Sequence, residues 1–239
     1  MRRTVAGLIV AVLAASAMPV SADAATPPPY RINLFRAGDF VSQVNSRTCV
    51  GASIQMMVNI GGPDDRSRAT QMRFWQLARD LGNSRFGGAN ARGWATALPV
   101  LDEGIYMVDS QPNLRQAVTR AARAIRLTSR PVGLLVWHGA HAWVMHGFEA
   151  TADPIEDPAA KITAVFMSDP WYPRVSAAFG VSPRPNSKLS IAGLGDDFLP
   201  WKRRHRNPEK DGRYFLVLPF PDYLTQLGPG AWTSGGITW

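Results

Sequence analysis

Residues 131–149 of this chain read PVGLLVWHGAHAWVMHGFE, two apolar runs separated by the short segment His138-Gly139-Ala140. Apolar runs of this length around a short glycine-containing turn are typical of two antiparallel strands joined as a hairpin. The second run, from His141 to Glu149, is apolar on both alternating faces, which indicates a buried central strand. We therefore expect a sheet built around this hairpin, with His141 emerging at the end of the sheet.

Helical patterns precede the hairpin and further strand patterns follow it. Apolar residues recur at helical spacing over residues 49–60, 67–81, 91–101 and 113–127, which predicts four helices. Strands are predicted over residues 105–108, 162–167 and 214–218, and residues 30–35 are a candidate edge strand or arm. This order predicts an α+β fold of two packed layers, with N-terminal helices packed on a C-terminal antiparallel sheet.

The N-terminus has the pattern of an export signal. A basic start is followed by an apolar run over residues 5–17 and by Ala22-Asp23-Ala24, a small-x-small pattern that signal peptidases cut. We expect a signal peptide over residues 1–24, cleaved near the Ala24–Ala25 bond, and a secreted or periplasmic (cell-envelope) mature protein. The apolar run is shorter than the roughly 20 residues of a spanning helix, so the mature form should lack a transmembrane segment.

The mature chain is long enough for one domain with a full core. We expect an N-terminal arm over residues 25–39, and one domain over 40–239 with a Pro/Gly-rich C-terminal extension. Whether residues 30–39 cover a cleft as an inhibitory arm is left open. The formal charge of +8 makes an anionic cell-envelope polymer a candidate partner, and no nucleic acid is expected. The basic run at residues 201–206 either contacts such a polymer or is a solvated loop.

Cys49 is the only cysteine of the chain, so it forms no internal disulfide. It begins the first predicted helix, where the helix dipole stabilises a thiolate. A lone thiol in an exported protein is either a small buried hydrophobe or a nucleophile, and the histidine-containing strand downstream favours the nucleophile. The single cysteine and four histidines show no zinc-ligand spacing, so we expect no metal site and no cofactor.

Three further residues are candidates for the same site. His141 is the candidate general acid and base, with His138 as its main rival, whereas His146 falls on the opposite strand face and is expected in the core. Asp169 ends the following strand, so antiparallel pairing could place it beside His141 to orient the imidazole. Gln43 is a candidate oxyanion donor together with the Cys49 backbone N–H.

These residues resemble the papain superfamily of cysteine peptidases. The resemblance rests on Gln43, the segment beginning at Cys49, the hairpin with His141, and Ser168-Asp169-Pro170, and it is closest to the branch of bacteriocin leader (double-glycine) peptidases. It implies a papain-like fold and a secreted thiol protease in which Gln43, Cys49, His141 and Asp169 cleave amide bonds of a peptide or protein. The chain departs from the family pattern after the nucleophile, where Val50-Gly51 replaces Gly-Pro.

Two alternative functions remain open at this point. A transglutaminase-like acyl transferase would use the same order of cysteine, histidine and aspartate, but would pass the acyl group to an amine instead of water. A catalytically inactive papain-like binding module would grip a peptide or cell-wall polymer in the same cleft. Gln43 and the Ala-Ser-x-Gln-Met sequence after Cys49 favour the hydrolase.

Overall fold

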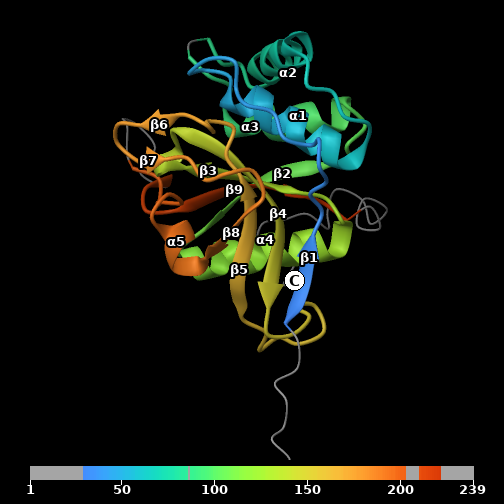
Figure 1. Cartoon of the computed structure of the whole chain (residues 1–239), viewed down its shortest axis with the longest axis vertical. Helices are drawn as coiled ribbons and strands as arrows, with labels where there is room; N and C mark the ends of the chain where they lie inside the picture. The colour runs from blue at the N-terminus through green and yellow to red at the C-terminus, as the bar shows by residue number, and fades with distance from the viewer. Residues whose placement is uncertain (1–28, 86, 203–209, 222–239) are drawn as a thin grey trace, which may run out of the picture.

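The computed structural model describes residues 29–85, 87–202 and 210–221. The predicted signal peptide, residues 203–206 of the basic run, and the chain beyond residue 221 lie outside the described residues. Within them the chain forms helices packed on an antiparallel sheet (Figure 1), which confirms the α+β class.

The predicted helices and strands are all present, with boundaries shifted by a few residues at most. The helices are α1 (Cys49–Gly61), α2 (Arg68–Leu81), α3 (Ala91–Val100), α4 (Leu114–Thr128) and the short α5 (Ile191–Gly195), with a 3-10 turn η1 (Trp137–Gly139). The strands are β1 (Tyr30–Asn33), β2 (Tyr106–Gln111), β3 (Val132–Val136), β4 (His141–Ala150), β5 (Ile162–Ser168), β6 (Val175–Ser176), β7 (Gly180–Val181), β8 (Ser187–Ser190) and β9 (Tyr214–Pro219).

The hairpin of β3 and β4 lies at the centre of the sheet, as predicted. The strand order is β2-β9-β3-β4-β5-β8, and β1 pairs with the far half of β4, from Gly147 to Ala150. Val136 pairs with His141 across the hairpin, and Val144 pairs with Ser168 of β5. The first residues of β4 and the residues just after β5 therefore meet at one end of the sheet.

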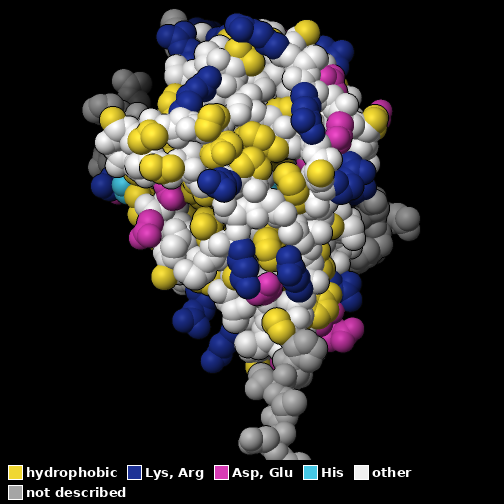
Figure 2. Space-filling model, viewed as in Figure 1, with side chains coloured by type: hydrophobic (Ala, Val, Ile, Leu, Met, Phe, Trp, Pro, Cys, Tyr) yellow, Lys and Arg dark blue, Asp and Glu magenta, His cyan; other side chains and the backbone are white. Residues whose placement is uncertain are grey.

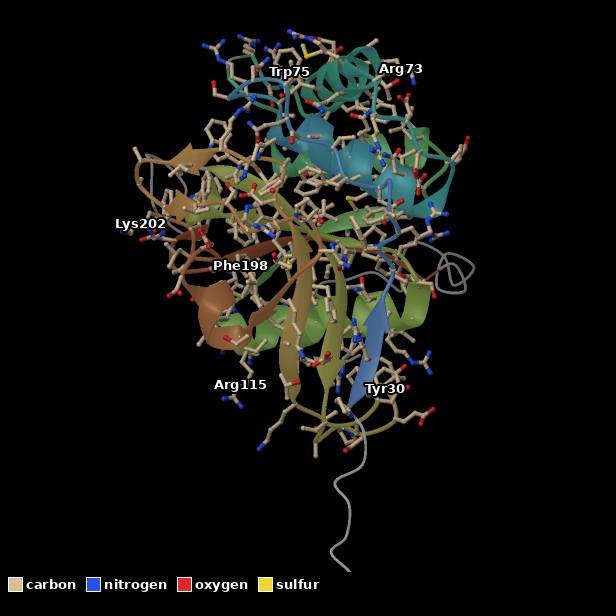
Figure 3. All side chains as sticks on the ribbon, in the orientation of Figure 1. Tyr30, Arg73, Trp75, Arg115, Phe198 and Lys202 are labelled. Carbon is tan, nitrogen blue, oxygen red and sulfur yellow. The ribbon has the colours of Figure 1, made fainter. Side chains whose placement is uncertain are left out.

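Helices cover both faces of the sheet, which corrects the expected arrangement of two layers. Helices α1, α2 and α3 gather at the upper end of the molecule and pack on the face that carries Ala142 and Val144 (Figure 1). Helix α4 packs on the other face, against Trp143 and Met145. The pattern of α4 predicted its buried side correctly, and the exposed Arg115 projects from it into solvent (Figure 3). A hydrophobic stripe shows that a helix packs, but not on which face of a sheet.

Residues 175–195 contain elements that the sequence did not predict. Strands β6, β7 and β8 and helix α5 have two to five residues each, too short for a periodic pattern. They form because neighbours supply what the local sequence lacks: β8 pairs with β5, and the Ser190 hydroxyl accepts a hydrogen bond from Gly193 N–H at the start of α5 (3.1 Å).

The face of the molecule in Figure 2 carries its positive charge in a dispersed form. Figure 2 shows Lys and Arg side chains scattered over one face among acidic and apolar groups, not gathered in one patch. No helix within the described part of the chain is long and apolar enough to cross a membrane.

Candidate active site

Cys49 is the first residue of α1 and is partly accessible to solvent. The helix begins without a side-chain cap, because the Thr48 hydroxyl is engaged with the backbone of Asn45 (3.2 Å). The backbone N–H groups of the first helical turn have no partner within the helix. Their partial positive charge therefore lies beside the sulfur and favours negative charge there.

Close packing fixes α1 against both α2 and the sheet. A side chain at Gly51 would come within 2.7 Å of the Trp75 Cβ and within 2.8 Å of the Gln71 carbonyl oxygen, so only glycine allows this approach of α1 to α2. On the sheet side, the Ser53 hydroxyl donates to the carbonyl of Ala142 (3.4 Å). These contacts hold the start of α1 next to the first residues of β4.

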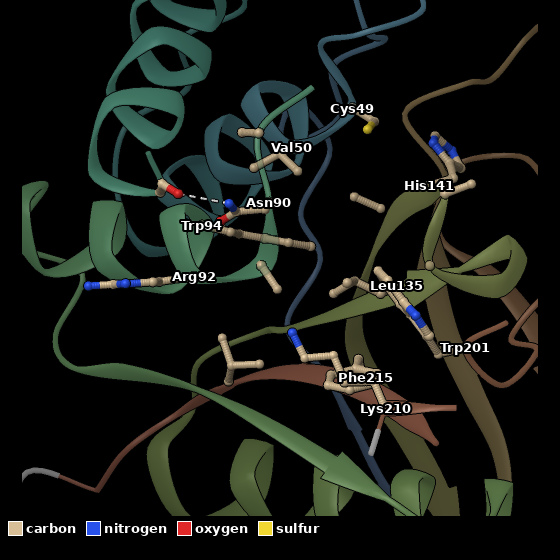
Figure 4. Close-up of a pocket in the computed structure, with 17 residues that line it drawn as sticks. Cys49, Val50, Asn90, Arg92, Trp94, Leu135, His141, Trp201, Lys210 and Phe215 are labelled. Atoms are coloured by element: carbon tan, nitrogen blue, oxygen red, sulfur yellow. Dashed lines mark hydrogen bonds between the residues drawn. The ribbon is translucent and has the colours of Figure 1, made fainter. Parts of the chain in front are cut away.

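The structure brings His141 and Asp169 into direct contact. His141 Nε2 lies 2.7 Å from Asp169 Oδ1, and both side chains are buried. The backbone N–H of Trp171 also donates to Asp169 Oδ1 (2.7 Å), which fixes the carboxylate. Since Asp169 engages Nε2, the other ring nitrogen, Nδ1, remains for Cys49, whose sulfur faces the ring at the same edge of a cavity (Figure 4).

Aromatic side chains hold the imidazole of His141 on two sides. Trp137 stacks on it, with ring centroids 4.2 Å apart and planes at 23°, and Phe179 stacks on the outer face of Trp137 (4.8 Å, 4°). Trp171 approaches the imidazole edge-on (6.4 Å, 80°). These rings restrict rotation of His141 and shield its bond with Asp169 from water.

Asp197 fixes Trp137 in turn. The Trp137 indole N–H donates to Asp197 Oδ1 (2.7 Å), and its backbone N–H donates to the Asp197 carbonyl (2.8 Å). The Trp137–Gly139 turn has positive φ at Trp137 (55°), His138 (58°) and Gly139 (83°), which costs free energy at the two residues that are not glycine. A side chain at Gly139 would also collide with Trp201, at 2.1 Å. The turn is therefore held in this conformation by its tertiary contacts.

The surroundings of His141 change its pKa. Burial alone would lower the pKa of this imidazole, but the hydrogen bond with Asp169 and the interaction with Cys49 outweigh burial and raise it to about 9. At neutral pH the ring therefore carries its proton. Burial also raises the pKa of Asp197, whose bond with Trp137 opposes the shift, while the charge of Asp169 adds to it.

The other two histidines of this region lie outside the pair. His138 Nδ1 lies 2.7 Å from the carbonyl oxygen of Pro200, so this rival candidate is engaged elsewhere. His146 is fully buried, lies 3.0 Å from the Ser168 hydroxyl and packs against Phe35. Its burial lowers its pKa to about 3, so this ring is neutral. Of the three, only His141 faces Cys49.

The segment before Cys49 is tied to the segment after Asp169. Gln43 N–H donates to the carbonyl of Pro170 (2.8 Å), and the Ser42 hydroxyl donates to the carbonyl of Tyr172 (2.5 Å). The Gln43 side chain is buried, and its Nε2 donates to the carbonyl of Asn45 (2.6 Å). Gln43 therefore lies beside the turn that leads into α1, with one amide hydrogen already used.

A cavity of about 660 Å³ opens beside Cys49 and His141 (Figure 4). Helices α1 and α3 and the loop before α3 form one wall, and strands β2, β3, β4 and β9 contribute to the other. Its lining is mainly apolar and includes Val50, Trp94, Leu135, Trp201 and Phe215. Besides His141, the lining also contains two basic side chains, Arg92 and Lys210. No described residue of the arm at 29–39 lines this cavity.

Comparisons with known proteins do not assign this chain to a family. No protein-family model matches the chain, and no curated protein matches it either. Among the described residues, no three His, Cys, Asp or Glu side chains are grouped so that they could hold a metal ion.

Sequence reasoning missed the groups that surround the imidazole. Trp137 was treated only as the end of a strand, whereas its positive φ turns its ring onto His141. Asp197 lies in a segment without a recognisable pattern and reaches the site only through the fold. The one available signal was the sequence Trp137-His138-Gly139, in which a tryptophan directly precedes a turn that leads to the candidate histidine.

Proposed function

We propose that this chain is an exported papain-like cysteine hydrolase, a peptidase that cleaves amide bonds. One observation carries the proposal: the lone thiol at the N-terminus of α1 faces an imidazole whose far nitrogen is bound by a buried carboxylate at 2.7 Å. A thiolate is stabilised by a helix N-terminus and by a neighbouring imidazolium. Cysteine, histidine and aspartate then hold the three roles that nucleophilic acyl transfer requires.

The reaction follows from these positions. The Cys49 thiolate attacks the carbonyl carbon of the scissile amide, and the electron pair moves to the oxygen as the tetrahedral intermediate forms. His141 passes its proton to the leaving amine, the C–N bond breaks, and a thioester remains on Cys49. His141 then takes a proton from water as the water attacks the thioester, which releases the acid and restores the thiolate and imidazolium.

The oxyanion needs hydrogen-bond donors beside the attacked carbonyl, and two groups are candidates for this role. The backbone N–H of Cys49 begins an uncapped helix, and Gln43 has a second amide hydrogen besides the one that Asn45 accepts. We assign the oxyanion to these two donors. Removing one such donor costs about 10²- to 10³-fold in kcat in enzymes of this kind. A Gln43→Ala variant that keeps full kcat would remove Gln43 from this role.

Alkylation by iodoacetamide tests the activated pair without any knowledge of the substrate. Cys49 is the only cysteine, so all label reports on this site. We expect Cys49 to react faster than an ordinary thiol at mildly acidic pH, because a helix N-terminus and an imidazolium face the sulfur. A profile that follows an ordinary thiol would show that the pair is not activated.

Incubation with a labelled amine and a glutamine-bearing protein distinguishes acyl transfer from hydrolysis, since only a transferase would incorporate the label.

A further inference from the structure

The cavity beside the thiol is positioned to select the substrate. Cys49 and His141 lie at one edge of its lining, and Lys210 and Phe215 lie at the opposite side (Figure 4). A group seated in the cavity would therefore be attached to the backbone close to the bond that Cys49 attacks. This inference rests on the function proposed above and concerns the substrate of the same site.

The walls nearest the thiol favour an apolar side chain. Val50 and Trp94 come from the helical wall and Leu135 from the sheet, and each presents hydrocarbon or ring surface to the cavity. The volume of about 660 Å³ lies within the range of small-molecule sites, roughly 300–1,000 Å³. It is large enough for a bulky side chain together with a neighbouring residue.

The far side of the cavity carries positive charge that no described residue compensates by an ion pair. Lys210 is half-buried and Arg92 is exposed, and neither forms an ion pair within the described part of the chain. The cavity lining includes no acidic side chain among the described residues. A cation beside an apolar cavity without a protein counter-ion attracts an anionic group of a ligand.

The two cations differ in direction. In Figure 4 the side chain of Lys210 extends across Phe215 and its ammonium points into the cavity, whereas the guanidinium of Arg92 points away from Cys49 and His141. Lys210 is therefore the residue placed to meet a bound anion. Arg92 adds to the positive potential at the rim.

We propose that the cavity binds a peptide segment with a bulky apolar residue next to the scissile bond and a carboxylate side chain, Glu or Asp, one or two residues from it. The apolar side chain packs between Trp94 and Leu135, and the carboxylate pairs with Lys210. Lys210 is then a specificity-determining residue, which touches substrate without taking part in bond cleavage.

Paired peptides test this proposal. Internally quenched peptides with blocked ends would carry Leu or Phe at a fixed position, with Glu or its neutral analogue Gln one or two residues away on either side. We expect the wild-type protein to prefer Glu over Gln by about 5- to 10-fold in kcat/KM, and the preference to shrink in high salt. Lys210→Met should abolish the preference, so that the Glu and Gln peptides are cleaved with equal kcat/KM.

The matched control is Lys202→Met, because Lys202 is exposed and lies outside the cavity lining. This variant should keep the preference for Glu. Equal cleavage of Glu and Gln peptides by the wild-type protein, or a preference that survives Lys210→Met, would overturn the proposal.

A binding measurement separates this proposal from the proposed function. The same peptides can be tested for protection of Cys49 from iodoacetamide, which requires no turnover. Glu peptides should protect the wild-type protein at about 5- to 10-fold lower concentration than Gln peptides, and both should be equal on Lys210→Met. Protection without cleavage would support the substrate site and contradict the peptidase. Cleavage with no difference between Glu and Gln would support the peptidase and contradict the role of Lys210.

Discussion

The two histidines of β4 lie on one strand, but their pKa values are shifted in opposite directions. His141 at the end of the strand is 5% exposed and His146 in its middle is 0% exposed, so both are buried. Nevertheless the pKa of His141 is raised to about 9, whereas that of His146 is lowered to about 3. The difference lies in the partner: His141 contacts the carboxylate of Asp169, and His146 contacts the neutral hydroxyl of Ser168.

This comparison shows that burial by itself produces a neutral, inert imidazole in this fold. A buried imidazole keeps its proton only where an anion compensates for the loss of water. In this chain the anion comes from the residue directly after Ser168, the partner of His146. The chemistry at the end of β4 therefore depends on Asp169 reaching the ring, and the variants below separate the two environments.

The largest expected effect comes from removing each histidine in turn. His141→Ala removes the proposed general acid and base, so kcat/KM should fall by about 10³-fold or more. His146→Asn should leave kcat/KM within a few-fold of the wild-type value and lower the melting temperature, because His146 acts through packing. Peptide cleavage assays and thermal melts check both. Comparable losses of activity in the two variants would contradict the distinction.

Asp169→Asn should make His141 resemble His146. Without the carboxylate, burial is opposed only by the interaction with Cys49, so the pKa of His141 should fall from about 9. We expect kcat/KM to fall by about 10²- to 10⁴-fold, because the tautomer and charge of the imidazole are no longer held. The alkylation profile of Cys49 should lose its reactivity at low pH. An unchanged profile would show that another group holds the imidazolium.

A smaller effect is expected from Trp137, the positioning residue that stacks on His141. Trp137→Leu removes the stacking and should lower kcat by about 10-fold with little change in KM. Trp137→Phe keeps an aromatic face but loses the hydrogen bond with Asp197, so it should recover part of that activity. A loss that is equal for Leu and Phe, or that appears only in KM, would argue against positioning through the ring.

The smallest effect concerns stability as a function of pH. The raised pKa of His141 contributes stability that is complete below about 6.5, the ordinary value, and is lost as the pH rises through about 9. The lowered pKa of His146 has the opposite consequence: its contribution is complete above about 6.5 and declines as the pH falls towards about 3. Together they should place the maximum of stability near pH 6.5.

Melting temperatures from pH 4 to 10 check this expectation, with shifts of about several degrees on each side. His141→Ala should flatten the alkaline side and His146→Asn the acidic side. If neither variant changes the side assigned to it, the two imidazoles do not carry the pH dependence.

Local patterns predicted the elements because each pattern depends on neighbours in the chain. The helix that starts at Cys49, the amphipathic α4 and the hairpin of β3 and β4 are all readable within windows of fewer than about 20 residues. Antiparallel strands also bring the start of one strand to the end of the next, so the contact of His141 with Asp169 was accessible to prediction. The short elements between residues 175 and 195 were not, since their stability comes from β5 and the core.

From the sequence alone came the α+β class, a thiol at a helix N-terminus and a histidine at the end of a buried strand, because these depend on periodicity and on residues close in the chain. Only the tertiary structure decided which imidazole is charged, how Trp137 and Asp197 hold it, and that Lys210 and Arg92 border the cavity. Those properties depend on residues distant in sequence that share one low-dielectric volume, where the identity of the nearest partner determines the protonation state.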